Sequence, residues 1–317
     1  MRAIVATRFG GPEVLELTEV PDPVAGPGEL LVEVAVAGVG WLDTQVRQGK
    51  GPDFISVSPP YIPGGAVAGV VSAVGAGVDS DFLGMRVLGR PRHGGYAERA
   101  VVPADTAAVV PDGLDLAVAT TLLDDGTTAI ALLNRTPVHA GEWVLVQPAL
   151  GGLGSFLVQL AAARGARVIA AARGEHKLVA AKELGAVEAV DYSDPRWTDQ
   201  VLALTGGVGV SVVFDGVGGS LGVAAAGLVA SGGRFSGYGM PGGAPTPVPA
   251  GGVGMEQLPE FWPDMGRNLR AALSAAVSGE VRPVIGSRFA LASAGEAHLE
   301  IESRRNVGKV LLWVVSA

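Results

Sequence analysis

Two adjacent carboxylates and one histidine are the side chains best suited to acid–base chemistry. Asp124 and Asp125 stand in the segment LLDDGTTA, and His93 directly precedes GGYAE in a predicted loop. An acid or an imidazole that faces a substrate can donate or accept a proton. Asp125 also has a structural interpretation, because an Asp at the start of a helix over TTAIALLN would cap its first-turn amides. The sequence leaves these two roles of Asp125 open.

The chain offers little for metal or thiol chemistry. It contains no cysteine, which excludes disulfides, thiolate nucleophiles and cysteine-ligated zinc. Its four histidines, at positions 93, 139, 176 and 298, are too far apart to form a local metal motif. We therefore expect no metal site.

Charge and hydropathy narrow the expected partners to small molecules. The formal net charge is −8 and no cluster of Lys and Arg is present, whereas nucleic-acid binding relies on such clusters. No run of 18 residues lacks polar or charged side chains, so we expect no membrane span. The start MRAIVATRFGGPEVL lacks the pattern of a secretory signal. We expect a cytoplasmic protein that acts on a small-molecule substrate.

A glycine cluster between two apolar segments indicates a ligand site. The stretch VLVQPALGGLGSFLVQL, residues 144–160, predicts a buried strand, a turn with the pattern AxGGxG from Ala149 to Gly154, and a helix. Glycines at such a turn let a diphosphate approach the amide groups at the helix N-terminus, where the helix dipole favours an anion. The strict pattern is GxGxxG, and here Ala149 takes the first position. The second strand, RVIAAA at 167–172, follows at the spacing expected of a dinucleotide-binding unit.

The end of that second strand indicates which dinucleotide is bound. An Asp or Glu there accepts hydrogen bonds from the ribose of NAD, whereas an Arg accommodates the 2′-phosphate of NADP. Arg173 occupies this position, Lys177 follows one helical turn later, and Tyr192 ends the next strand. A guanidinium binds phosphate through paired, charge-assisted hydrogen bonds. These residues predict NADPH as the cofactor, unless Arg173 and Lys177 merely solubilise the start of a helix.

The elements that must position these residues change in character near residue 120. Earlier segments, such as 30–39 and 65–75, are short β-branched runs between Pro and Gly turns, which is typical of a β-rich domain. Later segments alternate strand and helix patterns, which predicts a parallel sheet covered by helices on both faces. The stretch 239–262 is rich in Gly and Pro, and we expect a surface loop or lid there. The patterns around 265–277 and 308–315 predict a helix and an apolar strand.

Several motifs, in the same order along almost the whole chain, resemble the zinc-free quinone oxidoreductases of the medium-chain dehydrogenase/reductase superfamily. They are FGGPEVLEL, GGYAE, the Thr128–Ala129 pair, ALGGLG, LGA, DGVGG, GGRF and the closing GKVLL. The resemblance implies an α/β protein with a GroES-like β-rich catalytic domain and a Rossmann domain with a doubly wound parallel sheet. We expect the first domain to span 1–122, completed by 265–317, and the second to span 123–264. It also implies NADPH-dependent reduction of quinones or activated alkenes, and a homodimer.

The resemblance assigns cofactor roles by position. Gly151, Gly152, Leu153 and Gly154 would hold the diphosphate. The 2′-phosphate would lie among Arg173, Lys177 and Tyr192. The residues that it places along the rest of the cofactor are Thr128 near the nicotinamide, Val217, Gly237, Tyr238 and Asn306. Val217 has an alternative interpretation as a core residue, and Asn306 as the cap of a turn.

Departures from the family pattern bear on mechanism. Gly40 replaces the Asn of the GVN motif, Gly51 replaces an aromatic residue, and Ala66 takes the acidic position of PGxExAG, although Asp43, Arg47 and Gly49 are kept. The His–Glu pair of zinc alcohol dehydrogenases is absent, so metal-assisted alcohol oxidation is not expected. Trp41 would shape a pocket wall and stack on a flat substrate.

Three functions are compatible with these residues. The first is a metal-free NADPH-dependent reductase of quinones or α,β-unsaturated carbonyls, in which the cofactor carries the difficult step. The second is a non-redox cyclase, isomerase or lyase that uses Asp125 for proton transfer. The third is a non-catalytic NADPH-binding protein. The intact nucleotide signature favours the first, while the Asp pair, Gly40 and Ala66 favour the second.

Overall fold

The computed structural model describes residues 1–52 and 55–314. Contacts between Cα atoms divide the chain into two compact units. The first comprises Met1–Asp124 together with Ile285–Ala317, and the second comprises Asp125–Val284.

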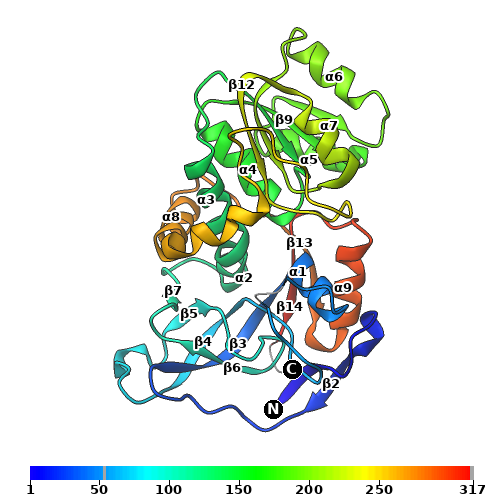
Figure 1. The fold of residues 1–317 in the computed structure, drawn as a ribbon. Coiled ribbons are helices and arrows are strands. Elements are labelled where there is room, and N and C mark those ends of the chain that lie inside the picture. The colour runs from blue at the N-terminus through cyan, green and yellow to red at the C-terminus, as the bar shows by residue number, and fades with distance from the viewer. Residues whose placement is uncertain (53–54, 315–317) are drawn as a thin grey trace. The chain divides into compact units, whose positions relative to one another are not determined.

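The first unit is built on a mixed sheet that joins both ends of the sequence. Strand β14 (Lys309–Trp313) pairs antiparallel with β3 (Glu29–Val39), so the red C-terminal strand lies beside the blue β3 in Figure 1. The sheet order is β13-β14-β3-β4-β5-β7, with β6 also paired to β3. The remaining elements are β1 (Arg2–Ala6), β2 (Leu15–Glu19), β4 (Val67–Val74), β5 (Arg86–Gly89), β6 (Arg99–Pro103), β7 (Ala108–Val109), β13 (Ile285–Ala290), α1 (Trp41–Arg47), α2 (Leu116–Thr121), α9 (Ala294–Glu302) and the short turns η1 (Pro12–Val14), η2 (Ser80–Phe82) and η5 (Leu291–Ser293).

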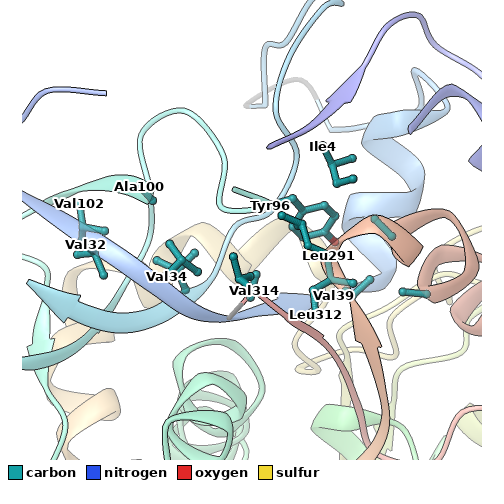
Figure 2. Packing of buried hydrophobic residues seen from close by; sticks show 14 of the residues in the cluster. Ile4, Val32, Val34, Val39, Tyr96, Ala100, Val102, Leu291, Leu312 and Val314 are labelled. Carbon is teal, nitrogen blue, oxygen red and sulfur yellow. The ribbon is translucent and has the colours of Figure 1, made fainter. Parts of the chain in front are cut away.

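The alternation of buried and less buried side chains along the first half of β3 explains how this strand contributes to the core of the unit. Leu30, Val32 and Val34 are buried at every second position, as expected of a strand with one face on the core. Figure 2 shows Val32 and Val34 packed in one cluster with Tyr96, Leu312 and Val314. The C-terminal strand therefore supplies part of the N-terminal core.

The second unit is a five-stranded parallel sheet in the order β10-β9-β8-β11-β12. This is the Rossmann arrangement, in which the strand order reverses between β8 and β11. Its strands are β8 (Trp143–Gln147), β9 (Arg167–Ala172), β10 (Glu188–Asp191), β11 (Val210–Asp215) and β12 (Val229–Gly237). Its helices are α3 (Thr127–Arg135), α4 (Gly152–Ala163), α5 (Glu175–Glu183), α6 (Trp197–Leu204), α7 (Gly219–Ala226), α8 (Met265–Val277) and η4 (Met255–Asp264).

The helices cover the sheet on two faces. Trp197 and Val201 of α6 and Ala225 of α7 are buried in one cluster with strand side chains such as Leu145. Right-handed crossovers in this strand order put α4 and α5 on the opposite face. Ligands of open α/β sheets bind outside the carboxyl ends of the strands where the order reverses. In this sheet those ends are Gln147 and Asp215, which are directly paired.

One predicted boundary of the units is wrong. The helix α8, which we assigned to the first domain with 265–317, belongs to the second unit. Its Asn268 accepts a hydrogen bond from Asn134 of α3 at 3.3 Å. Gln159 of α4 likewise bonds the carbonyl and the N–H of Arg282. Only the chain from Ile285 onward returns to the first unit, since β13 and β14 pair there.

The predicted loop at 239–262 is more ordered than its composition suggests. Residues 255–264 form the 3₁₀ helix η4. Gly242 donates to the Val217 carbonyl at 2.7 Å, and Gly237 and Val253 are linked by a 2.8 Å backbone bond. The segment is thus hydrogen-bonded to the strand ends of the second unit.

One helix of the described chain, Leu116–Arg135, is long and apolar enough to cross a membrane by length and composition alone. It contains α2, the π-helical turn η3 (Leu122–Gly126) and α3. Its most apolar window is 72% buried within the protein, as in the core helix of a globular fold.

Candidate nucleotide-binding site

The three glycines between β8 and α4 have different surroundings. A Cβ at Gly154 would lie 1.9 Å from the Pro148 carbonyl oxygen, so this glycine allows the turn itself to close. A Cβ at Gly151 would make only ordinary contacts, the nearest at 3.5 Å from the Pro148 ring, so sterics do not require a glycine there. A Cβ at Gly152 would lie 2.2 Å from the Asp125 Oδ2. Only part of the glycine pattern is therefore explained by a ligand.

The first turn of α4 suits an anion. Gly151 is the N-cap residue and supplies no side chain to cap the first-turn amides. The helix then runs for 12 residues, so its dipole directs positive charge at this turn. Gly151, Gly152, Leu153 and Gly154 all lie here, as the sequence predicted.

Asp215 organises the neighbouring strand end. Its fully buried carboxylate accepts hydrogen bonds from the Gln147 Nε2 at 2.9 Å and from the Val217 N–H at 2.8 Å. It also accepts from the Gly218 N–H and from the Thr246 hydroxyl. These bonds fix the loop after β11. Asp215 was not predicted to be a site residue, although it is the first residue of the quoted motif DGVGG.

Arg173 is exposed directly after β9, with Asp191 nearby. The Asp191 carboxylate accepts the Gly174 N–H at 3.0 Å and the Ser193 N–H at 2.8 Å. Burial acts to raise the pKa of Asp191, but these N–H groups and the charge of Arg173 outweigh it, and the pKa lies below its usual value. Asp191 therefore shapes the turn that presents Arg173.

The other predicted cofactor residues of this unit occupy different environments. Lys177 is buried in the first half of α5, at 8% exposure, and Tyr192 is half-buried after β10. Tyr238 donates its hydroxyl to the Gln147 carbonyl at 3.3 Å. Thr128 lies half-buried in α3, and Val217 and Gly237 are buried, the former 4% exposed.

Three predicted site residues belong to the first unit. Trp41 is the half-buried first residue of α1, and His93 is exposed in the loop before Tyr96. Asn306 donates to the Gly308 carbonyl at 3.1 Å, which is the turn-capping role left open from the sequence.

The two adjacent carboxylates diverge. Asp124 pairs with Arg90 at 2.6 Å and lies 3.9 Å from the Lys309 Nζ, both in the first unit. Asp125 lies against Gly152 in the second unit. The capping interpretation of Asp125 lacks the free helix start that it requires, because α3 continues from α2 through η3 and Gly126, the residue before α3, is itself helical.

A buried chain of polar side chains runs through the first unit. Arg47 can only donate hydrogen bonds, so its contact at 3.4 Å with the His298 Nδ1 requires the neutral imidazole to carry its proton on Nε2. His298 Nε2 then donates to the Tyr96 hydroxyl at 3.2 Å. Tyr96 in turn hydrogen-bonds Asp43, whose Oδ2 accepts the Gly40 N–H at 2.8 Å.

Burial sets the protonation states of the hydrogen-bonded side chains Asp43 and His298. It raises the pKa of Asp43 to about 6, against the lowering effects of the Gly40 N–H and the Lys309 charge. Burial and the charge of Arg47 lower the pKa of His298 to about 3. The imidazole is therefore neutral near pH 7, while Asp43 titrates just below it.

His298 and Tyr96 were not predicted to be hydrogen-bond partners, although the histidine at 298 and the motif GGYAE, which contains Tyr96, were both noted in the sequence. Their separation of 202 residues gives no local signal. Within residues 1–52 and 55–314, no group of three or more His, Cys, Asp or Glu could hold a metal ion.

Comparisons with known proteins agree with this architecture. Residues 26–112 match the alcohol dehydrogenase GroES-like domain, and residues 152–259 match the zinc-binding dehydrogenase family. The quinone oxidoreductase of Pseudomonas aeruginosa is 32% identical over 323 residues, covering 96% of this chain and 97% of that protein. The chain belongs to the quinone oxidoreductase family of the medium-chain dehydrogenase/reductase superfamily.

Two further family members add information about ligands. The 2-haloacrylate reductase of a Burkholderia species is 29% identical over 330 residues, covering 98% of both chains. The Escherichia coli quinone oxidoreductase was solved as a complex with NADPH. Its TM-score with this chain is 0.90 at 27% identity, with 99% of this chain and 100% of that chain covered.

Proposed function

We propose that this quinone oxidoreductase family member reduces quinones or α,β-unsaturated carbonyls with NADPH and without a metal. The observation that carries the proposal is the glycine-capped first turn of α4 at the reversal of strand order, with Arg173 exposed at the end of β9. The NADPH complex of the E. coli relative and the name of the 2-haloacrylate reductase support the cofactor and the substrate class.

The residues of the second unit fit such a cofactor. The N–H groups around Gly151 to Gly154 would bind its diphosphate, and Arg173, with Tyr192 and Lys177, its 2′-phosphate. Thr128, Val217, Gly237 and Tyr238 would line its remaining length. Asn306, a residue of the first unit, is assigned to the cofactor by the family resemblance alone. When bound, NADPH supplies a hydride, so the protein needs only to orient the reactants and provide a proton.

Few residues are candidates for the proton donor and for the wall of the substrate pocket. We propose Asp125 or His93 as the proton donor and Trp41 as a wall that stacks on a flat substrate. The side chain of His93 is exposed. These roles rest on residue chemistry and on the family pattern.

A substrate screen tests the proposal. NADPH oxidation would be followed against 1,4-benzoquinone, 9,10-phenanthrenequinone and simple enones, with NADH as the matched control. We expect turnover with at least one acceptor and a preference for NADPH. Tight NADPH binding without turnover of any acceptor would instead favour a non-catalytic binding protein. Conversion of a substrate without consumption of NADPH would favour the non-redox alternative.

A further inference from the structure

The Asp125 side chain lies against the first turn of α4. A Cβ built on Gly152 would be 2.2 Å from Oδ2, 2.9 Å from Cγ and 3.4 Å from Oδ1 of Asp125. Gly152 is the first residue of the helix, immediately after its N-cap. The space beside this glycine is thus filled by a carboxylate of the same unit.

This position favours negative charge. The first-turn N–H groups of a helix have no partner within the helix, and the helix dipole adds positive potential there. A carboxylate and a diphosphate are attracted by the same groups. Two anions at one helix terminus also repel each other. The repulsion between like charges falls only slowly with distance, so it acts even if the two groups do not touch.

The charge of Asp125 reaches the carboxyl ends of the strands. Tyr238, which bonds the last residue of β8, has its pKa raised well above the usual value by burial first and then by the charges of Asp215, Asp125 and Tyr192. Asp125 and Asp215 therefore both contribute negative potential at the place where the strand order reverses. Arg173, after β9, is the exposed positive group at these strand ends.

We propose that Asp125 competes with the cofactor diphosphate for the first turn of α4 and so weakens the binding of NADPH. This inference rests on the proposed function. It differs from a role in proton transfer, since it concerns affinity and acts before any chemistry. The side chain must rotate away from Gly152, or remain there at an electrostatic cost, when the nucleotide binds.

Direct binding measurements test the inference. NADPH would be titrated into the wild-type protein, Asp125→Asn and Asp125→Ser, with nucleotide fluorescence as the readout. Asp199→Asn is the matched control, because Asp199 is an exposed acid of α6 in the same unit. We expect both Asp125 variants to bind NADPH about tenfold more tightly, the size expected when one charge close to a diphosphate is removed. The control should bind as the wild type does.

Two smaller nucleotides locate the effect. Adenosine diphosphate carries the diphosphate, whereas adenosine 2′-monophosphate carries only the phosphate that Arg173 would hold. We expect the Asp125 variants to gain affinity for adenosine diphosphate and to leave adenosine 2′-monophosphate unchanged. Equal gains for both ligands would assign the effect to general charge and overturn the inference.

The outcomes separate the inference from the proposed function. If the wild type binds NADPH and the Asp125 variants bind it equally or more weakly, the inference fails and the proposed function stands. If none of the proteins binds NADPH, the proposed function fails and the inference with it. Asp125→Glu keeps the charge, so a tenfold gain in that variant would also contradict the inference.

Discussion

Arg173 is the side chain on which the choice of nucleotide depends. It is exposed at the end of β9, and the carboxylate of the neighbouring Asp191 accepts hydrogen bonds from the N–H groups of Gly174 and Ser193. A guanidinium held on such a turn can bind a phosphate through two parallel hydrogen bonds. Because NADH lacks the 2′-phosphate, the contribution of Arg173 should be specific to NADPH.

Replacing Arg173 by Asp tests this specificity. We expect NADPH affinity to fall by about 100-fold, since a strong charge-assisted contact becomes a repulsion, while NADH affinity changes by less than about threefold. Fluorescence titrations with both nucleotides measure the difference, and Arg173→Lys serves as the charge-conserving control. Equal losses for the two nucleotides would refute the assigned role.

Asp43 makes stability depend on pH. Its pKa is raised by burial to about 6, above the ordinary value of 3.8. The folded protein therefore binds this proton more tightly than the unfolded chain does. The resulting stabilisation is present below about pH 4 and is lost as the pH rises through about 6.

The variant Asp43→Asn removes this dependence while its side-chain oxygen can still accept the Gly40 N–H. We expect the free energy of unfolding of the variant, relative to wild type, to increase between pH 4 and pH 7 by up to about 3 kcal/mol. Urea unfolding at several pH values measures it. The lowered pKa of His298 has the opposite effect: the stabilisation that the neutral imidazole contributes is lost as the pH falls from 6.5 towards 3. Because His298 is present in both proteins, its contribution cancels in the comparison. A difference that does not vary with pH would contradict the assignment.

The connection from β8 to α4 shows how one short element can meet several demands. Gly154 is required by the turn, Gly152 accommodates Asp125, and Gly151 has room for a methyl group in ordinary contact. The apolar run from 144 to 146 is completely buried, which fixes the strand that leads into the turn. A rigid strand before the turn and a helix after it hold the N–H groups in place for a ligand.

A matched pair of alanine substitutions separates these demands. Gly154→Ala places a methyl group against the Pro148 carbonyl, and we expect it to lower the free energy of unfolding by about 1–3 kcal/mol. Gly151→Ala meets only ordinary contacts, and its stability should lie within about 0.5 kcal/mol of the wild type. Thermal or denaturant unfolding measures the free energy of unfolding of both variants. Equal stability of the pair would show that the turn can relax around a methyl group.

The molecule as a whole consists of two units: the chain begins in the first, builds the second and returns to the first. The first unit is closed by β14, which pairs with β3 after the chain has built the second unit. Among the described strands, β12 ends the five-stranded parallel sheet, so one side of it has no neighbouring strand in that sheet. A strand at the end of a sheet can pair with a second copy, although Val253 already bonds the backbone of Phe235 and Gly237 at the end of β12.

We expect the protein to be a homodimer in solution. Light scattering coupled to size-exclusion chromatography should give about twice the 32.0 kDa mass of one chain. The value should hold across a dilution series if the interface is stable. A mass of one chain at all concentrations would exclude the dimer.

Local patterns were enough to predict most of the framework. The β-branched run at 30–39 between Pro and Gly turns predicted β3, and the strand-then-helix spacing after residue 140 predicted the series β8 to β12, because residue composition and periodicity are local properties of a chain. The glycine pattern and Arg173 were recognisable for the same reason. The segment 239–262 was harder, since its hydrogen bonds join it to strand ends far away in sequence.

What the amino-acid sequence by itself determined is the two-part α/β architecture, the nucleotide turn and the quinone oxidoreductase family. Only the tertiary structure decided that α8 packs with the second unit, that His298, Tyr96 and Asp43 form one buried chain, and that neighbouring Asp124 and Asp125 serve different units. The physical reason is that hydrogen bonds, burial and charge act across space. Their partners are separated by up to hundreds of residues and leave no mark in local spacing.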